Sequence, residues 1–139
     1  MTDDATRALV QNLYDAYSRG DRDRLAVLLD DNIDWIIHAP VQVFSFAGAR
    51  HGKAEVLATL TGITRDYVLE RYEPEVIIVE NDRAAVTSSV AFKQRTTGRT
   101  LSFRNANFLR FQGGRLVEFR EFIDTFDVVE QALGRWLEV

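Results

Sequence analysis

Residues 115–124 read RLVEFREFID and show the apolar-polar alternation of a β-strand. Because side chains on a strand point to alternate faces, the stretch separates into two sets. The more apolar set consists of Val117, Phe119, Glu121 and Ile123. Glu121 is the exception in this row, since a buried carboxylate needs a partner or a function to offset its desolvation. The groups that face Glu121 must come from the neighbouring elements.

Three further extended segments precede this strand, at about 67–80, 83–96 and 99–112. The sequences ENDR, TTGR and QGGR separate the four segments and favour hairpin turns, so antiparallel pairing is predicted. Another strand is predicted at 32–40, where NIDWIIHAP is rich in β-branched and aromatic residues and ends at Pro40.

Helices are predicted mainly in the first half of the chain. Thr2 caps the first, Gly20 ends it, and Asp21 caps a short second helix over 22–29. A third helix is expected near 53–63 and a last one from Thr125 to about Gly134. The order α-α-β-α-β-β-β-β-α predicts an α+β fold, in which N-terminal helices wrap a curved antiparallel sheet into a cone with an internal pocket.

Length and composition indicate one domain over 1–139 with an ordinary balance of 46% hydrophobic and 27% charged residues. The net charge of −4 and the scattered basic residues disfavour a nucleic-acid partner. No apolar run is long enough for a membrane span, and the acidic N-terminus is unlike a secretory signal, so a cytoplasmic protein is expected. With no cysteine and two separated histidines, no metal site is expected.

Polar groups interrupt the apolar rows of three neighbouring strands. They are Ser88, then Asn105 and Asn107, and finally Glu121. A solid core avoids unpaired polar groups, because each costs about 1–3 kcal/mol, whereas a binding pocket combines apolar walls with a few convergent polar groups. The pattern therefore predicts a pocket lined by Glu121. The alternative is a buried carboxylate satisfied by the two asparagines or by an arginine.

Three stretches resemble the nuclear transport factor 2-like superfamily, in its SnoaL-like and ketosteroid isomerase-related branch: YSRGDRDRLAVLLDDNIDW at 17–35, GKAEVL at 52–57 and GGRLVEFREFIDTFDVV at 113–129. The resemblance covers nearly the whole chain. It implies a cystatin-like cone, a homodimer through the sheet, an apolar small-molecule pocket and no cofactor. Activities in the branch include isomerisation, polyketide ring closure, epoxide hydrolysis and dehydration.

FREFID at 119–124 resembles the closing strand of limonene epoxide hydrolases, which implies that Glu121 is the pocket's carboxylate base. His38 falls near the position of the hydrolases' water-holding Asn and of the isomerases' Asp base. Two departures stand against the best-known activities. Ser88 and Val90 replace the hydrolases' Arg and Asp, and the isomerases' oxyanion Tyr falls at about Leu13.

We therefore expect a small enzyme of isomerase, cyclase or lyase type that acts on an apolar molecule bearing a carbonyl or hydroxyl. Glu121 is predicted as general base or acid, His38 as its partner or a water holder, and Asn105 as the donor to a developing oxyanion. The loop 41–52 is a candidate lid. The predicted substrate-binding residues are Tyr17, Trp35, Phe46, Ser88, Phe92, Phe103 and Phe119. A non-catalytic binding domain with the same pocket and a protein-interaction domain are the alternatives.

Overall fold

The computed structural model describes all residues, 1–139, and its elements follow the predicted order with one addition. The helices are α1 (Asp3–Ser18), α2 (Arg22–Leu28), α3 (Lys53–Asp66) and α4 (Thr125–Leu133). The strands are β1 (Leu29–His38), β2 (Gly48–His51), β3 (Tyr67–Glu80), β4 (Arg83–Gln94), β5 (Thr100–Gln112) and β6 (Arg115–Ile123). The addition is β2, which lies within the segment predicted as a loop.

Side-chain caps fix where the helices begin. The Thr2 hydroxyl accepts a hydrogen bond from the Ala5 amide at 3.1 Å, and the Asp21 carboxylate accepts one from the Arg24 amide at 3.2 Å. Both caps satisfy N–H groups that have no partner within the helix. Gly20, at φ 65°, makes the turn between α1 and α2 in a conformation that residues with a Cβ rarely adopt.

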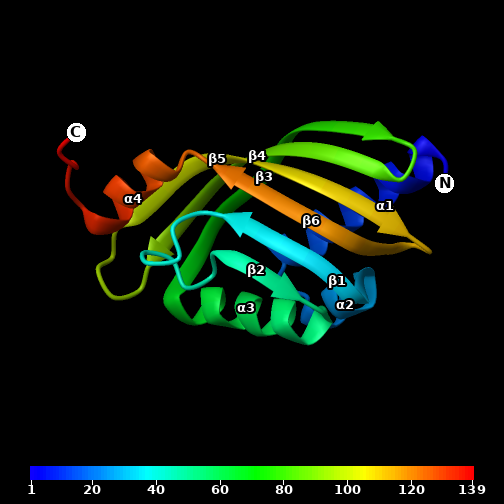
Figure 1. The fold of residues 1–139 in the computed structure, drawn as a ribbon, viewed down its shortest axis with the longest axis horizontal. Coiled ribbons are helices and arrows are strands. Elements are labelled where there is room, and N and C mark those ends of the chain that lie inside the picture. Colours follow the sequence, from blue (N-terminus) through cyan, green and yellow to red (C-terminus); the bar gives the residue numbers. More distant parts are fainter.

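The six strands form one curved sheet in the order β2-β1-β6-β5-β4-β3, which confirms the α+β class (Figure 1). The hairpin-connected strands β3 to β6 pair antiparallel as predicted, but β1 and β6 pair in parallel. No hairpin joins β1 to β6, so no turn forces them to run in opposite directions. The sheet is therefore mixed, and the expectation of a wholly antiparallel sheet is wrong.

A bulge in β6 changes one predicted inward residue. Arg110 pairs with Glu118 and Phe111 pairs with Leu116, which leaves Val117 as the extra residue. Leu116 is fully buried while Val117 is partly exposed, so Leu116 takes the inward place predicted for Val117. Beyond the bulge the alternation holds, and Phe119 and Glu121 both face inward.

Helices α1, α2 and α3 cover the concave face of the sheet, whereas α4 packs at the far end of β5 (Figure 1). The main core joins Val10 of α1 and Val56 of α3 to Val86 and Phe111 of the sheet. A smaller cluster joins α4 to Phe44 of the 39–47 loop. None of the helices is both long and apolar enough to cross a membrane. Between the two clusters the interior is hollow, and this hollow contains Glu121.

Candidate active site

A pocket lies between the concave face of the sheet and the helices. Of its 21 lining residues, 19 are hydrophobic, and the exceptions are Asn105 and Glu121. The cavity has a volume of about 80 Å³, several times the ~10–15 Å³ that is needed to hold a single water. Mostly apolar walls with a few convergent polar groups are the usual construction of a small-molecule site.

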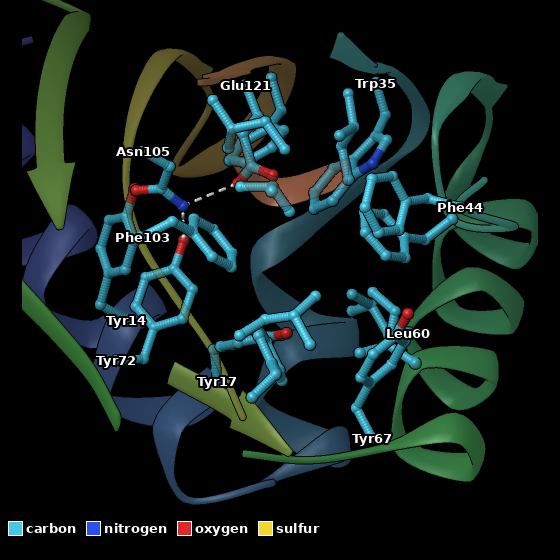
Figure 2. A pocket seen from close by; sticks show the side chains of 18 of the residues that line it. Tyr14, Tyr17, Trp35, Phe44, Leu60, Tyr67, Tyr72, Phe103, Asn105 and Glu121 are labelled. Carbon is cyan, nitrogen blue, oxygen red and sulfur yellow. Dashed lines mark hydrogen bonds between the residues drawn. The ribbon is translucent and has the colours of Figure 1, made fainter. Parts of the chain in front are cut away.

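Glu121 is held by two side-chain amides from the adjacent strand β5, and Figure 2 shows the one that belongs to Asn105. Its Oε1 accepts hydrogen bonds from Asn105 Nδ2 at 2.9 Å and from Asn107 Nδ2 at 3.0 Å. Asn107 lies directly opposite Glu121 in the β5–β6 register, which explains why its amide reaches the carboxylate. No protein hydrogen bond is made by Oε2, so this oxygen is free to act on a ligand.

Burial raises the pKa of Glu121 from 4.5 to about 7, although the hydrogen bonds from Asn107 and Asn105 pull it the other way. Desolvation wins because the pocket offers no cation beside the carboxylate, and the apolar walls disfavour its charged form. A carboxylate with a pKa near neutrality is ionised often enough to accept a proton and basic enough to hold it.

Two tyrosines hold the asparagine pair in place. The Tyr14 hydroxyl donates to Asn107 Oδ1 at 2.6 Å, and the Tyr72 hydroxyl donates to the same oxygen at 3.3 Å. Tyr72 also accepts a hydrogen bond from Asn105 Nδ2 at 2.7 Å. Burial and the Glu121 carboxylate both raise the pKa of each tyrosine, so both hydroxyls stay protonated as donors at neutral pH. Both tyrosines, both asparagines and Glu121 therefore belong to one hydrogen-bonded network.

The structure brings most of the predicted substrate-binding residues together. Six of the seven line the pocket: Tyr17, Trp35, Phe46, Phe92, Phe103 and Phe119. Ser88 does not, since it is fully buried beneath the pocket and its hydroxyl has no partner. The prediction for Ser88 is therefore wrong in placement, although its inward orientation on β4 is correct.

His38 is also misplaced by the prediction. It is exposed on the outer face of the sheet, where its ring stacks on Phe122 with the centroids 4.5 Å apart. Strand alternation gives the physical reason, because Ile37 is paired with Glu121 on the inward side and His38 must then point outward. The predicted pairing of His38 with Glu121 is wrong, and Ile37 occupies the place expected for the imidazole.

Asn105 lines the pocket as predicted, but it is not a free donor. Both hydrogens of its Nδ2 are taken, one by Glu121 and one by Tyr72, while its Oδ1 is buried without a partner. The one buried N–H group of the lining that lacks a partner belongs to Trp35. Its indole stacks on Phe119 with ring centroids 3.9 Å apart, and it lies two positions before Ile37, the neighbour of Glu121.

The 39–47 loop closes one side of the pocket with Phe44 and Phe46. Arg50 holds this loop through its guanidinium, which donates to the carbonyl oxygens of Ser45, Ala47 and Ala49 at 2.8, 3.1 and 3.0 Å. Phe44 is almost completely buried. The predicted lid is therefore a packed and hydrogen-bonded wall in this structure.

No three His, Asp or Glu side chains lie close enough together to hold a metal ion. The chemistry that the described residues can supply is proton transfer by Glu121 and hydrogen bonding by its surroundings.

The fold and the pocket define a protein of the cystatin-like α+β cone class, and comparisons with known proteins agree. A family model described as the SnoaL-like domain matches residues 10–119. The chain therefore belongs to the SnoaL-like family, within the nuclear transport factor 2-like superfamily, as its sequence motifs predicted. A search of the curated proteins finds no match.

Solved structures share this fold over nearly the full chain. A protein from Rhodopseudomonas palustris, provisionally named an isomerase, is 40% identical with a TM-score of 0.84, and the alignment covers 97% of this chain and 100% of that one. A nuclear transport factor 2-like protein from Burkholderia xenovorans LB400 is 22% identical, with coverages of 95% and 98% and a TM-score of 0.83. A Catenulispora acidiphila protein with a ketosteroid isomerase-like fold, in complex with trimethylamine, is 12% identical, with coverages of 94% and 97% and a TM-score of 0.76.

Proposed function

We propose that this protein is a small enzyme in which Glu121 transfers a proton to and from an apolar substrate that bears a carbonyl or hydroxyl group. The observation that carries the proposal is the state of the Glu121 carboxylate. One oxygen is fixed by two amides, the other is free of protein hydrogen bonds, and the pKa is about 7. A carboxylate with only a structural role gains nothing from an oxygen left without a partner.

The proposed step begins with removal of a proton from the carbon next to the substrate carbonyl. The C–H electron pair moves into the new C=C bond, the carbonyl oxygen takes the negative charge, and Glu121 Oε2 holds the proton. The donors of the lining that have no protein partner include the indole N–H of Trp35 and the hydroxyl of Tyr17, whereas both amide hydrogens of Asn105 are already engaged. Return of the proton to another carbon completes an isomerisation. Attack of the enolate carbon on a second carbonyl, whose oxygen takes the proton back from Glu121, completes a cyclisation.

The family and its 40% identical member provisionally named an isomerase support this class of reaction. They leave open which of the isomerase, cyclase and lyase reactions is catalysed. A ligand-binding domain without catalysis would use the same apolar walls, but it would not require a base tuned to neutral pH.

The experiment uses nitrobenzisoxazole, a flat apolar probe whose ring opens to a coloured cyanophenolate when a base removes its C–H proton. We expect the wild-type protein to open the ring with a rate that rises with pH to a plateau, with a midpoint near 7. Glu121→Gln, nearly isosteric, should abolish this activity, while Glu73→Gln, a change at an exposed glutamate of β3, should retain it. Equal rates for wild type and Glu121→Gln would refute the base assignment.

We also propose a homodimer through the outer face of the sheet. The exposed rings of Phe108 and Phe122 are 5.9 Å apart there, and His38 stacks beside them. An ion pair between Arg104 and Glu75 places both signs of charge on the same face, and such a face can be complementary to a second copy of itself. Sedimentation velocity should show a dimer that Phe122→Glu converts to a monomer, and a monomeric wild-type protein would contradict the proposal.

A further inference from the structure

A second cavity adjoins the pocket and has a different chemical character. The two share six lining residues: Tyr17, Leu25, Leu60, Ile63, Tyr67 and Phe92. In Figure 2, Tyr17 and Tyr67 lie at the end of the pocket opposite Glu121. We call this second cavity the outer chamber. The same side chains wall both spaces, so the outer chamber lies directly beside the pocket, at the end away from Glu121.

Three arginines are among the residues that line the outer chamber. Its eight further lining residues include Arg19, Arg22 and Arg95, and none of its 14 lining residues is acidic. This is unexpected in a chain whose net charge is −4 and which has 21 acidic against 17 basic residues. A concentration of one charge at a cavity mouth raises the local concentration of ligands of the opposite charge.

Two of these cations have no carboxylate partner. Arg19 is paired with Asp15 at 2.9 Å, but neither Arg22 nor Arg95 forms an ion pair. Each is instead held by one backbone carbonyl of α3. Arg22 Nη1 donates to Leu57 O at 3.1 Å, and Arg95 Nε donates to Thr64 O at 3.2 Å.

Two acidic residues close to these arginines, Asp21 beside Arg22 and Asp66 beside Arg95, have other partners. Asp21, the neighbour of Arg22, caps α2 and lies 4.0 Å from Arg24. The Asp66 carboxylate accepts two hydrogen bonds from Arg65 at 3.0 and 3.2 Å. The guanidinium groups of Arg22 and Arg95 are therefore anchored but not neutralised, and their remaining N–H groups can donate to an anion.

We propose that the outer chamber binds the anionic end, a carboxylate or a phosphate, of an elongated substrate whose apolar body lies in the pocket. The reacting carbon would then lie near Glu121 and the charged end between Arg22 and Arg95. This inference depends on the proposed function in one respect only, namely which end of the substrate reacts. Tyr17 lines both spaces, and the pKa of its hydroxyl is raised by burial and by Glu121 and lowered by Arg22, consistent with a position between the two charges.

The test compares probes with one apolar body and three different ends. A naphthyl-alkyl carboxylate, the phosphate monoester and the uncharged alcohol of equal length are titrated into a Trp136→Phe protein, in which Trp35 of the pocket is the remaining tryptophan. Trp136 is 84% exposed in the C-terminal segment, so its replacement leaves the pocket intact. Quenching of Trp35 reports that the apolar body occupies the pocket.

We expect at least one anionic probe to bind about tenfold more tightly than the alcohol, because a hydrogen bond to a charged group contributes more than one between neutral groups. Arg22→Gln and Arg95→Gln should each remove most of this advantage and leave alcohol binding within about twofold. Arg22→Lys should restore part of it, while Arg83→Gln, the same change at the exposed first residue of β4 outside both cavities, should have no effect.

Tighter binding of the phosphate than of the carboxylate would assign a phosphate end, and the reverse order would assign a carboxylate. Raised salt should weaken the anionic probes alone. Equal affinity of all three probes for the wild type, or an anionic advantage that survives both arginine substitutions, would overturn the inference. Proton abstraction by Glu121 from nitrobenzisoxazole would be unaffected by either result, so failure here is distinguishable from failure of the proposed function.

Discussion

Replacing Glu121 by glutamine should make the protein more stable at neutral and alkaline pH. Glutamine has nearly the same shape, and its Oε1 can still accept both amide hydrogen bonds, from Asn105 and Asn107. What the substitution removes is the ionisation of a carboxylate whose pKa is raised by burial from 4.5 to about 7. At about 1.4 kcal/mol per pKa unit, this shift corresponds to about 3 kcal/mol of stability.

The sign follows from proton binding. The folded protein holds the Glu121 proton more tightly than the unfolded chain does, so its stability is highest while the carboxyl is protonated. That stability begins to fall as the pH rises above the ordinary pKa of 4.5, and the fall ends above the folded pKa of about 7. Because the substituted glutamine does not titrate, the stability of the variant relative to wild type should rise by about 2.5 kcal/mol between about pH 5 and about pH 8.

Urea unfolding at several pH values gives the two stability curves directly. All other titrating groups are common to both proteins, so the difference between the curves isolates Glu121. Glu73→Gln, at an exposed position, is the control and should give a flat difference. A flat difference for Glu121→Gln as well would show that the carboxylate is solvated like a surface group, and the reasoning from burial would be refuted.

Three further changes test particular parts of the structure. Tyr14→Phe should lower the free energy of unfolding by about 1–2 kcal/mol, measured in urea, because the 2.6 Å hydrogen bond to Asn107 is buried; no change would mean that the bond does not support the network. Phe44→Ala should lower the free energy of unfolding by about 3–5 kcal/mol in urea, because the ring is almost completely buried in the pocket wall. It should also speed ligand dissociation, measured by stopped flow. An unaltered stability would indicate a mobile loop. His38→Ala should leave the rate of nitrobenzisoxazole opening within about twofold, because the imidazole lies on the outer face; a large loss would place His38 back in the mechanism.

Local chemistry made most of the fold predictable. Thr2 and Asp21 cap their helices through side-chain hydrogen bonds that depend on a few neighbouring residues. Turn sequences separate the long strands, and β3 spans Tyr67–Glu80, in agreement with the extended segment predicted at about 67–80. Strand β2 was missed because the four residues from Gly48 to His51 carry little β-propensity, and only pairing with β1 defines them as a strand.

Pocket residues were predictable where the alternation of a strand is unbroken. Phe103 and Asn105 on β5, and Phe119 and Glu121 beyond the bulge of β6, face inward as expected. The same rule, applied to β1, would have separated His38 from the inward pair Trp35 and Ile37. The prediction for His38 depends instead on the resemblance to the epoxide hydrolases and ketosteroid isomerases, and this resemblance does not hold at that position.

Other features of the site depend on irregularities that the sequence does not reveal. Tyr72 lies on β3 between two register shifts, so alternation along that strand could not place its hydroxyl beside the asparagines. The hydrogen bond from the Asn107 amide to Glu121 depends on the cross-strand register that sets the two residues opposite each other, and a strand's sequence alone does not specify this register. Tyr14, by contrast, is buried on α1, and its helical spacing from Val10 and Leu13 indicates the face of the helix that packs on the sheet.

The central claim is that burial in the pocket raises the pKa of the Glu121 carboxyl group to about 7. Infrared titration measures this pKa most directly. In the spectrum of wild type minus Glu121→Gln, the account predicts that one carboxyl C=O band is replaced by carboxylate bands with a midpoint near pH 7. A midpoint near the ordinary value of 4.5 would contradict it and would leave the protein with a pocket but without its base.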